Sequence, residues 1–252
     1  MDLPMTALGD ASPPIRLAFV VPAYEAEASI ESVVRELLLH ARELPSVTTP
    51  PVIVVDDGSR DRTSERAGSA GALVVRHPVN QGKGSALITA LSRAYELGAR
   101  AAVSVDADGQ HPAREALEIA RNPAPPGALL LAVRNLARDG APRANRFSNA
   151  FSNAWMSLFA RRVLHDTQCG LRRYPLPEIL ALSLVGRGFE FETEVILKAM
   201  RAGLPVHEAP ARVIYPPAGE RVSHFHPVRD PARIVFRMLH TACTTPWRTP
   251  AP

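Results

Sequence analysis

The chain has 252 residues, 46% of them hydrophobic and 21% charged, which is enough for one large domain or two small ones around a well-buried core. Its net charge of +4, from 29 basic and 25 acidic residues, is too weak to indicate nucleic acid as a partner but is compatible with an anionic substrate or a membrane surface. With two cysteines, no signal-peptide pattern and no run of the ~18 apolar residues of a membrane span, we expect a cytoplasmic protein with at most peripheral membrane contact.

The first half of the chain alternates short apolar runs with helical apolar spacing. We expect residues 1–14 to be a disordered segment, 15–240 to form one domain and 241–252 to be a loose tail. The pattern then predicts strand 16–24, helix 29–43 with Ser29 as its cap, strand 51–57, helix 59–68, strand 72–77, helix 82–98, strand 101–108, a helix from Pro112 and strand 127–133.

The second half follows a different pattern. It predicts an amphipathic helix at 145–164, a turn-rich loop at 166–175, a helix at 189–203, a strand at 205–215 and a last helix at 226–243. The segment "PARIVFRMLHTAC" in this last helix could lie on a membrane surface or pack onto the domain, and we expect packing.

Alternating strands and helices indicate an α/β fold, with a mostly parallel sheet covered on both faces. Ligands of such sheets bind at the carboxyl ends of the strands. Polar residues follow four of the predicted strands at that edge: Tyr24, Glu25, Asp56, Asp57, Asp106, Asp108 and Arg134.

The stretch "SVDADGQHP" ends a buried strand on two nearly adjacent carboxylates, which repel each other unless a cation lies between them. Asp106, Asp108 and Gln110 would converge if the chain stayed extended, because residues two apart share one face of a strand. Carboxylate and amide oxygens suit Mg²⁺ or Mn²⁺. The alternative is a solvated turn, since "DADG" is also good turn chemistry.

Two further motifs have a functional and a structural interpretation. In "VDDGSRDRT", Asp56 or Asp57 could bind a nucleotide base or ribose, while Ser59 or Asp61 could cap the next helix. In "NQGKGSA", backbone donors at a helix start and Lys83 could attract an anion. Alternatively, this motif is a glycine-rich turn with a surface lysine.

Taken together, "VVPAYEAEASI", "VVDDGSRDRT", "NQGKGSALITAL", "VDADGQHP", "DTQCGLRRY" and "FEFETEVI" resemble the family 2 glycosyltransferases. The similarity is greatest to the dolichyl-phosphate (polyprenyl-phosphate) mannosyl- and glucosyltransferases. This resemblance implies a GT-A (nucleotide-diphospho-sugar transferase) fold and inverting, metal-dependent transfer of a hexose from a donor such as UDP-glucose or GDP-mannose.

The resemblance also implies roles for single residues. Asp106, Asp108 and Gln110 would hold Mg²⁺ or Mn²⁺ and the diphosphate, with Asp108 at the catalytic centre. The nucleotide sugar would be bound by Pro22, Tyr24, Glu25, Asp57, Lys83, Asp106 and Arg221, the last closing over the donor phosphates. Asp166, in "DTQCGLRRY", would lie beside the catalytic centre.

The chemical class of the acceptor can be inferred from how the acceptor group ionises. A phosphate monoester is already ionised near neutral pH and needs cations to position it rather than a base. Arg134 and Arg146 are the candidates, with Arg143 as a helper, and they favour a lipid-phosphate acceptor. The alternative is a hydroxyl acceptor (polysaccharide, glycolipid or natural product), with Glu190 or Glu192 as the base that it requires.

Overall fold

The computed structural model describes residues 16–44, 49–215 and 229–247. Seven strands and eight helices lie in this part of the chain: β1 (Leu17–Ala23), α1 (Ile30–Ala41), β2 (Val52–Asp56), α2 (Thr63–Ser69), β3 (Leu73–Arg76), α3 (Lys83–Glu96), β4 (Ala101–Ser104), α4 (Ala113–Arg121), β5 (Leu129–Arg134), α5 (Arg143–Ala160), β6 (Arg172–Pro175), α6 (Leu176–Leu180), α7 (Glu190–Arg201), β7 (Val206–Ala211) and α8 (Arg229–Thr244). Each strand predicted from the pattern is present.

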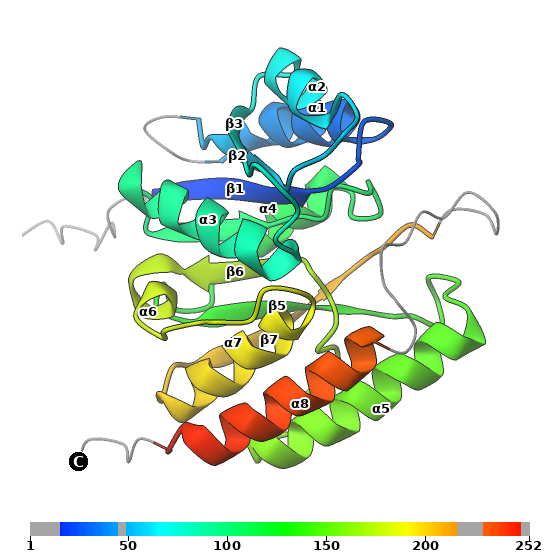
Figure 1. Ribbon diagram of the computed structural model, residues 1–252, viewed down its shortest axis with the longest axis vertical. Helices are drawn as coiled ribbons and strands as arrows, with labels where there is room; N and C mark the ends of the chain where they lie inside the picture. The colour runs from blue at the N-terminus through cyan, green and yellow to red at the C-terminus, as the bar shows by residue number, and fades with distance from the viewer. Residues whose placement is uncertain (1–15, 45–48, 216–228, 248–252) are drawn as a thin grey trace, which may run out of the picture.

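The strands form one mixed sheet in the order β3-β2-β1-β4-β6-β5-β7 (Figure 1). Strands β1, β2, β3 and β4 pair in parallel, as do β5 and β7. Only β6 is antiparallel to its neighbours, and it joins β4 to β5. All the other strands therefore point the same way, and their carboxyl ends meet at one edge of the sheet.

The expected loop at 166–175 is wrong in its second half, where residues 172–175 form β6. Its sequence, "RRYP", does not resemble a buried strand because it opens on two arginines. Both are buried because their guanidinium groups donate to backbone carbonyls: Arg172 to Thr167, Cys169 and Glu192, and Arg173 to Ala120, Asn122 and Ala124. Burial of a charge is tolerated where its donors are satisfied.

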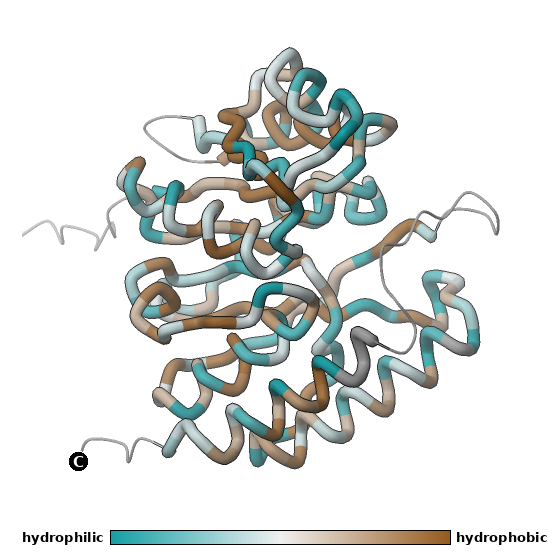
Figure 2. Tube along the Cα trace, viewed as in Figure 1, coloured by the Kyte–Doolittle hydropathy of each residue, from teal (hydrophilic) through white to brown (hydrophobic). Residues whose placement is uncertain are grey.

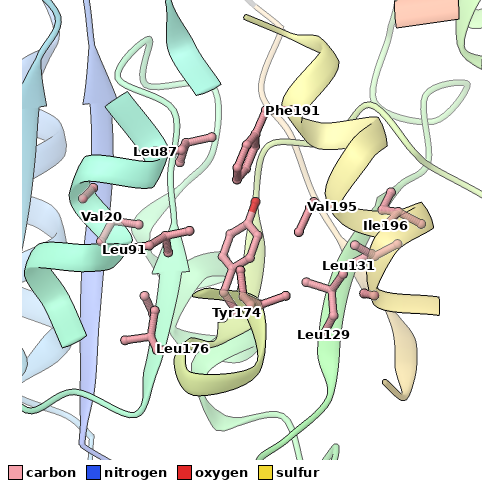
Figure 3. Packing of buried hydrophobic residues seen from close by; sticks show 14 of the residues in the cluster. Val20, Leu87, Leu91, Leu129, Leu131, Tyr174, Leu176, Phe191, Val195 and Ile196 are labelled. Carbon is pink, nitrogen blue, oxygen red and sulfur yellow. The ribbon is translucent and has the colours of Figure 1, made fainter. Parts of the chain in front are cut away.

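The sheet separates two apolar layers. Strand β1 is buried along its whole length, and its side chains alternate between the layers: Val20 packs with α3 and α7 residues, whereas Phe19 and Val21 pack with α1 residues. Figure 3 shows the first layer, with Leu87 and Leu91 of α3 near Tyr174 of β6. The helices of Figure 2 alternate between hydrophilic and hydrophobic colours, as expected for elements with one buried face.

Helix α8 packs onto the domain, as expected. Met238 and Thr241 of α8 are buried, and the Arg201 guanidinium of α7 donates to the Ala242 carbonyl at 2.7 Å. The helix continues to Thr244, so it takes up the first residues of the expected tail. Across the described ranges, no helix combines the length and the apolar character that crossing a membrane requires.

Candidate functional site

Strand β4 ends at Ser104, and the chain then turns instead of remaining extended. Gly109 has a φ of +74°, and one Asp108 carboxylate oxygen accepts the Gln110 backbone N–H at 2.9 Å. The chain is therefore not extended at Asp106, Asp108 and Gln110, so the condition for their convergence along one strand face is not met, and joint metal binding by the three residues stays a prediction. An Asp-Gly pair favours this turn because the Asp side chain bonds its own backbone two residues on.

Ser29 also differs from expectation, because its side chain does not cap α1. Its hydroxyl donates to the Ala107 carbonyl at 2.6 Å, inside the turn that bears the two aspartates. The start of α1 is thereby tied to this turn, across 78 residues of sequence.

Asp106 lies between a lysine and a glycine. Its Oδ1 is 2.7 Å from the Lys83 ammonium. Its Oδ2 lies where a Cβ on Gly170 would come within 2.4 Å, so the carboxylate fits there only because residue 170 has no side chain. Burial would raise the pKa of Asp106, but the charge and hydrogen bond of Lys83 together with the charges of His111 and Arg134 hold it below its usual value.

Asp108 reaches the surface but has protein atoms on most sides. This partial burial, followed by the neighbouring Asp106 charge, raises the pKa of Asp108 to about 6. Within the described residues no bond reaches the second Asp108 oxygen, and no cluster of three His, Cys, Asp or Glu side chains is present. The charge of Asp106 acts on Asp108, so the turn brings together two carboxylates, which are hard oxygen donors of the kind that suits Mg²⁺ or Mn²⁺.

Lys83 is not the surface lysine of the structural interpretation. Its ammonium lies 2.8 Å from Glu192 Oε1 of α7, in addition to Asp106, and 5.7 Å from the centre of the Phe189 ring. Burial by itself would lower the pKa of Lys83, but Asp106 and Glu192 raise it above its usual value, so the lysine is charged. Gly84 lets the start of α3 lie close to the loop before α7. A Cβ on residue 84 would lie 2.4 Å from the Gly186 carbonyl oxygen.

Asp57 is buried and holds the loop that leads to Lys83. Its carboxylate accepts the backbone N–H groups of Gln81 and Gly82 at 2.9 and 2.7 Å and is 2.7 Å from His77 Nδ1. Gly82 itself has a φ of +101°. Nucleotide binding by Asp57 stays a prediction, and the structure adds an internal role that the "VDD" motif did not indicate.

The end of β1 leads into the same region. Pro22 is buried within the strand, while Tyr24 and Glu25 follow it at the carboxyl edge. The Glu25 backbone has a φ of +49°, and its N–H donates to the Ser59 hydroxyl at 2.8 Å. The N-cap residue of α2 is Arg62, which makes no side-chain cap bond, so the predicted capping by Ser59 or Asp61 is wrong in position, although Asp61 accepts the Thr63 N–H at 3.0 Å from just before the cap.

On the other side of β6, Arg134 and Asp166 form a two-point ion pair. Arg134 Nε and Nη2 lie 2.7 and 3.0 Å from the two oxygens of the buried Asp166 carboxylate. Asn149 of α5 adds a third donor at 2.8 Å. Burial would raise the pKa of Asp166, but the Arg134 hydrogen bond and charge and the Asn149 bond hold it below its usual value.

A hollow of about 830 Å³ opens next to this ion pair. Its walls come from β5, the start of α5 and the segment between them, and it is bordered by three arginines, Arg134, Arg143 and Arg146. Phe147 and Asn153 of α5 also line it. Arg143 and Arg146 are exposed, and no ion pair with either was found in the described residues.

Arg172, the arginine of the "DTQCGLRRY" motif, has a structural role that the sequence did not indicate. Its buried guanidinium joins the 166–170 loop to α7 through the Thr167, Cys169 and Glu192 carbonyls. The position of "RRYP" after "DTQCGL" gave no signal for this role. Cys169 is buried as well, and burial raises the pKa of its thiol to about 12, which argues against a nucleophile. Arg221 lies outside the described residues.

Comparison with known proteins identifies the class. The profile described as Glycosyl transferase family 2 matches residues 18–168, more than half of the chain, so the chain belongs to this family and is a glycosyltransferase. A UDP-N-acetylglucosamine–dolichyl-phosphate N-acetylglucosaminyltransferase of Methanococcus voltae is 28% identical over 219 residues, covering 78% of this chain and 84% of its own.

A second relative is the dolichyl-phosphate beta-glucosyltransferase of Drosophila melanogaster, which is 29% identical over 223 residues, covering 80% of this chain and 68% of its own. Among solved structures, the glucosyl-3-phosphoglycerate synthase of Mycobacterium tuberculosis, in complex with Mn²⁺, UDP-glucose and phosphoglyceric acid, superimposes with a TM-score of 0.68. It has 18% identity and covers 91% of this chain and 80% of its own. The expected GT-A fold and the resemblance to the polyprenyl-phosphate branch are confirmed.

Proposed function

We propose that this enzyme transfers a hexose, with inversion, from a UDP- or GDP-linked donor to a polyprenyl phosphate. The observation that carries the proposal is the arginine-bordered hollow, because Arg134, which lines it, also acts through its charge on Asp106 after β4. The hollow has cations for an acceptor phosphate, and the turn has oxygen donors for a metal. The names of the relatives, which include two dolichyl-phosphate transferases, support the same acceptor class.

On the donor side, Asp106, Asp108 and Gln110 would hold Mg²⁺ or Mn²⁺, which supplies charge neutralisation for the leaving diphosphate. Asp57 holds the 81–82 backbone in place, and Pro22, Tyr24 and Glu25 border the same edge. These residues would line the nucleotide. Lys83 is the cation of this region, and its contacts position it between the turn and α7.

On the acceptor side, Asp166 fixes the Arg134 guanidinium by two bonds, which leaves the remaining N–H groups of Arg134 for a phosphate. Arg146, with Arg143 beside it, would complete the binding. A phosphate oxygen that is already ionised can attack the anomeric carbon without giving up a proton, so this chemistry requires positioning and no general base.

The two candidate bases for a hydroxyl acceptor are engaged elsewhere. Glu190 Oε1 accepts the Arg187 and Gly188 backbone N–H groups at 3.1 Å each, and Glu192 accepts from Lys83. A carboxylate held in this way is poorly placed to accept a substrate proton. This observation favours the phosphate acceptor over the hydroxyl alternative.

A lipid acceptor requires contact with a membrane, and α5 has the surface for it. We define the α5 stripe as four exposed apolar side chains at helical spacing: Phe147, Phe151, Trp155 and Leu158. Phe147, 76% exposed, also lines the hollow, so the stripe is continuous with the arginines. Residues 143–165 include four arginines and no acidic residue, which matches anionic headgroups. We therefore assign the stripe to the surface of an anionic bilayer.

Vesicle binding tests this assignment. Trp155 and Trp247 are the two tryptophans of the chain, so Trp247→Phe leaves Trp155 as the reporter. Its emission should shift to the blue with phosphatidylglycerol vesicles, and Phe147→Ser with Phe151→Ser should abolish cosedimentation. Leu39→Ser on α1 is the control, since Leu39 is 61% exposed outside the stripe. If the wild-type protein does not bind vesicles but forms a concentration-dependent dimer, and the serine variant does not form this dimer, the stripe is instead the interface with a second copy of the chain.

The function is tested with a panel of donors and acceptors. UDP-glucose, GDP-mannose and UDP-N-acetylglucosamine are each offered with Mg²⁺ and a polyprenyl phosphate, a polyprenol or 3-phosphoglycerate, and products are read by mass. We expect one donor to give a glycosyl phosphate lipid. If the enzyme transfers the sugar to the polyprenol, and Glu190→Gln or Glu192→Gln abolishes this transfer, the hydroxyl alternative is established. If 3-phosphoglycerate alone is glycosylated, a lipid acceptor is excluded.

A further inference from the structure

Lys83 occupies an unusual position for a donor-site lysine, because its ammonium bridges two carboxylates from different elements. The distances are 2.7 Å to Asp106 Oδ1 and 2.8 Å to Glu192 Oε1. The side chain is 20% exposed, so the ion pair is only partly screened by water. One of the two partners, Asp106, is also a proposed metal ligand.

Among the described residues, Lys83 is the lysine or arginine found within 4 Å of Asp106. His111 Nε2 lies 3.9 Å from Asp106 Oδ2. The Lys83 ammonium is therefore in direct contact with both Asp106 and Glu192, which share it.

We infer that Lys83 is an internal counter-cation that competes with a divalent cation for Asp106 and moves to the donor diphosphate when metal and donor bind together. The inference rests on the proposed metal site. A divalent cation at Asp106 and the Lys83 ammonium repel each other at such distances. The negative charge of an added diphosphate attracts both the divalent cation and the Lys83 ammonium, so it offsets the repulsion between them. Metal and nucleotide then bind as a unit, and the free metal binds weakly.

The side chain has the freedom that this exchange requires. Lys83 is the first residue of α3, and its ammonium is carried on a flexible four-carbon stem. Glu192 and the Phe189 ring are anchors that do not belong to the proposed metal ligands, and they keep the ammonium near the site after Asp106 is released. The two carboxylate partners of Lys83 thus have different roles: the contact with Asp106 is exchanged for the metal, whereas the contact with Glu192 is kept.

Two variants separate this role from simple structural support. Lys83→Met should bind free Mn²⁺ about tenfold more tightly, measured by the loss of the free-ion electron paramagnetic resonance signal. The same variant should bind UDP and GDP about tenfold more weakly at saturating Mn²⁺. Glu192→Gln should weaken free Mn²⁺ binding, because it removes a negative charge and leaves Lys83 on Asp106 alone. A misfolded variant would lose affinity for both ligands.

The control is Lys198→Met, which removes another lysine–glutamate pair of α7, 2.7 Å from Glu194, with no contact to Asp106. It should leave both affinities unchanged. Free Mn²⁺ bound equally or more weakly by Lys83→Met would overturn the inference while leaving the proposed function in place. If the wild-type protein binds neither Mn²⁺ nor nucleotide, in any combination, the proposed metal-dependent function fails together with the inference.

Discussion

The proposed donor side and the proposed acceptor side of the site differ in how firmly their charged groups are held. On the donor side, Asp57, Lys83 and Asp106 are joined by ion pairs and backbone bonds that link α3, β4 and α7. On the acceptor side only Arg134 is fixed, by Asp166, while Arg143 and Arg146 are exposed at the rim of the hollow. The difference suits a compact diphosphate on one side and a long, variable acceptor on the other.

The largest expected effect is on the donor half. Asp108→Asn should reduce turnover about a thousandfold or more, since metal-assisted charge stabilisation is worth several kcal/mol. It should also weaken Mn²⁺-dependent nucleotide binding, measured by calorimetry. Unchanged product formation by the purified variant would refute the metal assignment.

The fixed part of the acceptor half is tested by Asp166→Asn. The variant leaves the Arg134 charge without a carboxylate, which should lower the free energy of unfolding by about 2 kcal/mol, measured in urea. The acceptor KM should rise more than the donor KM. Equal stability of variant and wild type at pH 7 would show that the ion pair contributes nothing.

The pH dependence of this stability difference has a definite sign. The folded-state pKa of Asp166 is below its usual value, so its stabilising contribution is complete above the unfolded-state pKa of about 4. It is lost as the pH falls through the lower folded-state pKa. The stability difference between wild type and Asp166→Asn should therefore be constant from pH 7 to about pH 5 and narrow below about pH 4.

Gly170→Ala acts where the two halves meet. The added Cβ would lie 2.4 Å from Asp106 Oδ2, so either the carboxylate or the loop has to shift. Overpacking of this kind costs about 1–3 kcal/mol, and we expect kcat to fall about tenfold. Gly68→Ala is the control, because its Cβ would meet Val74 at an ordinary 3.8 Å. Full activity of Gly170→Ala would show that Asp106 has room to move.

The smallest effect is expected at the open rim. Arg146→Ala should raise the acceptor KM about tenfold, the equivalent of about 1.4 kcal/mol, and leave the donor KM unchanged. Initial rates with each substrate varied in turn provide the measurement. An equal rise in both KM values would argue against phosphate binding by Arg146.

The alternation of apolar runs was sufficient to predict the parallel strands and the polar edge, because fully buried strands have a simple composition. Strand β6 could not be predicted, because the burial of Arg173 depends on the Ala120, Asn122 and Ala124 carbonyls, which lie 53, 51 and 49 residues away in the sequence. For the same reason, the motif "NQGKG" indicated an anion site but not the Lys83 contact with Glu192, 109 residues away. Local patterns predict elements and candidate residues, whereas pairings between elements arise from the tertiary structure.

The antiparallel direction of β6 affects how the proposed donor and acceptor preferences could be changed. Because β6 runs against β4 and β5, the residues just before it arrive at the edge where those strands end. The short stretch 166–170 thus borders donor and acceptor at once, with Asp166 on Arg134 and Gly170 on Asp106. Grafting this stretch from a relative would transplant features of both subsites in a single exchange, so neither preference could be retuned there alone.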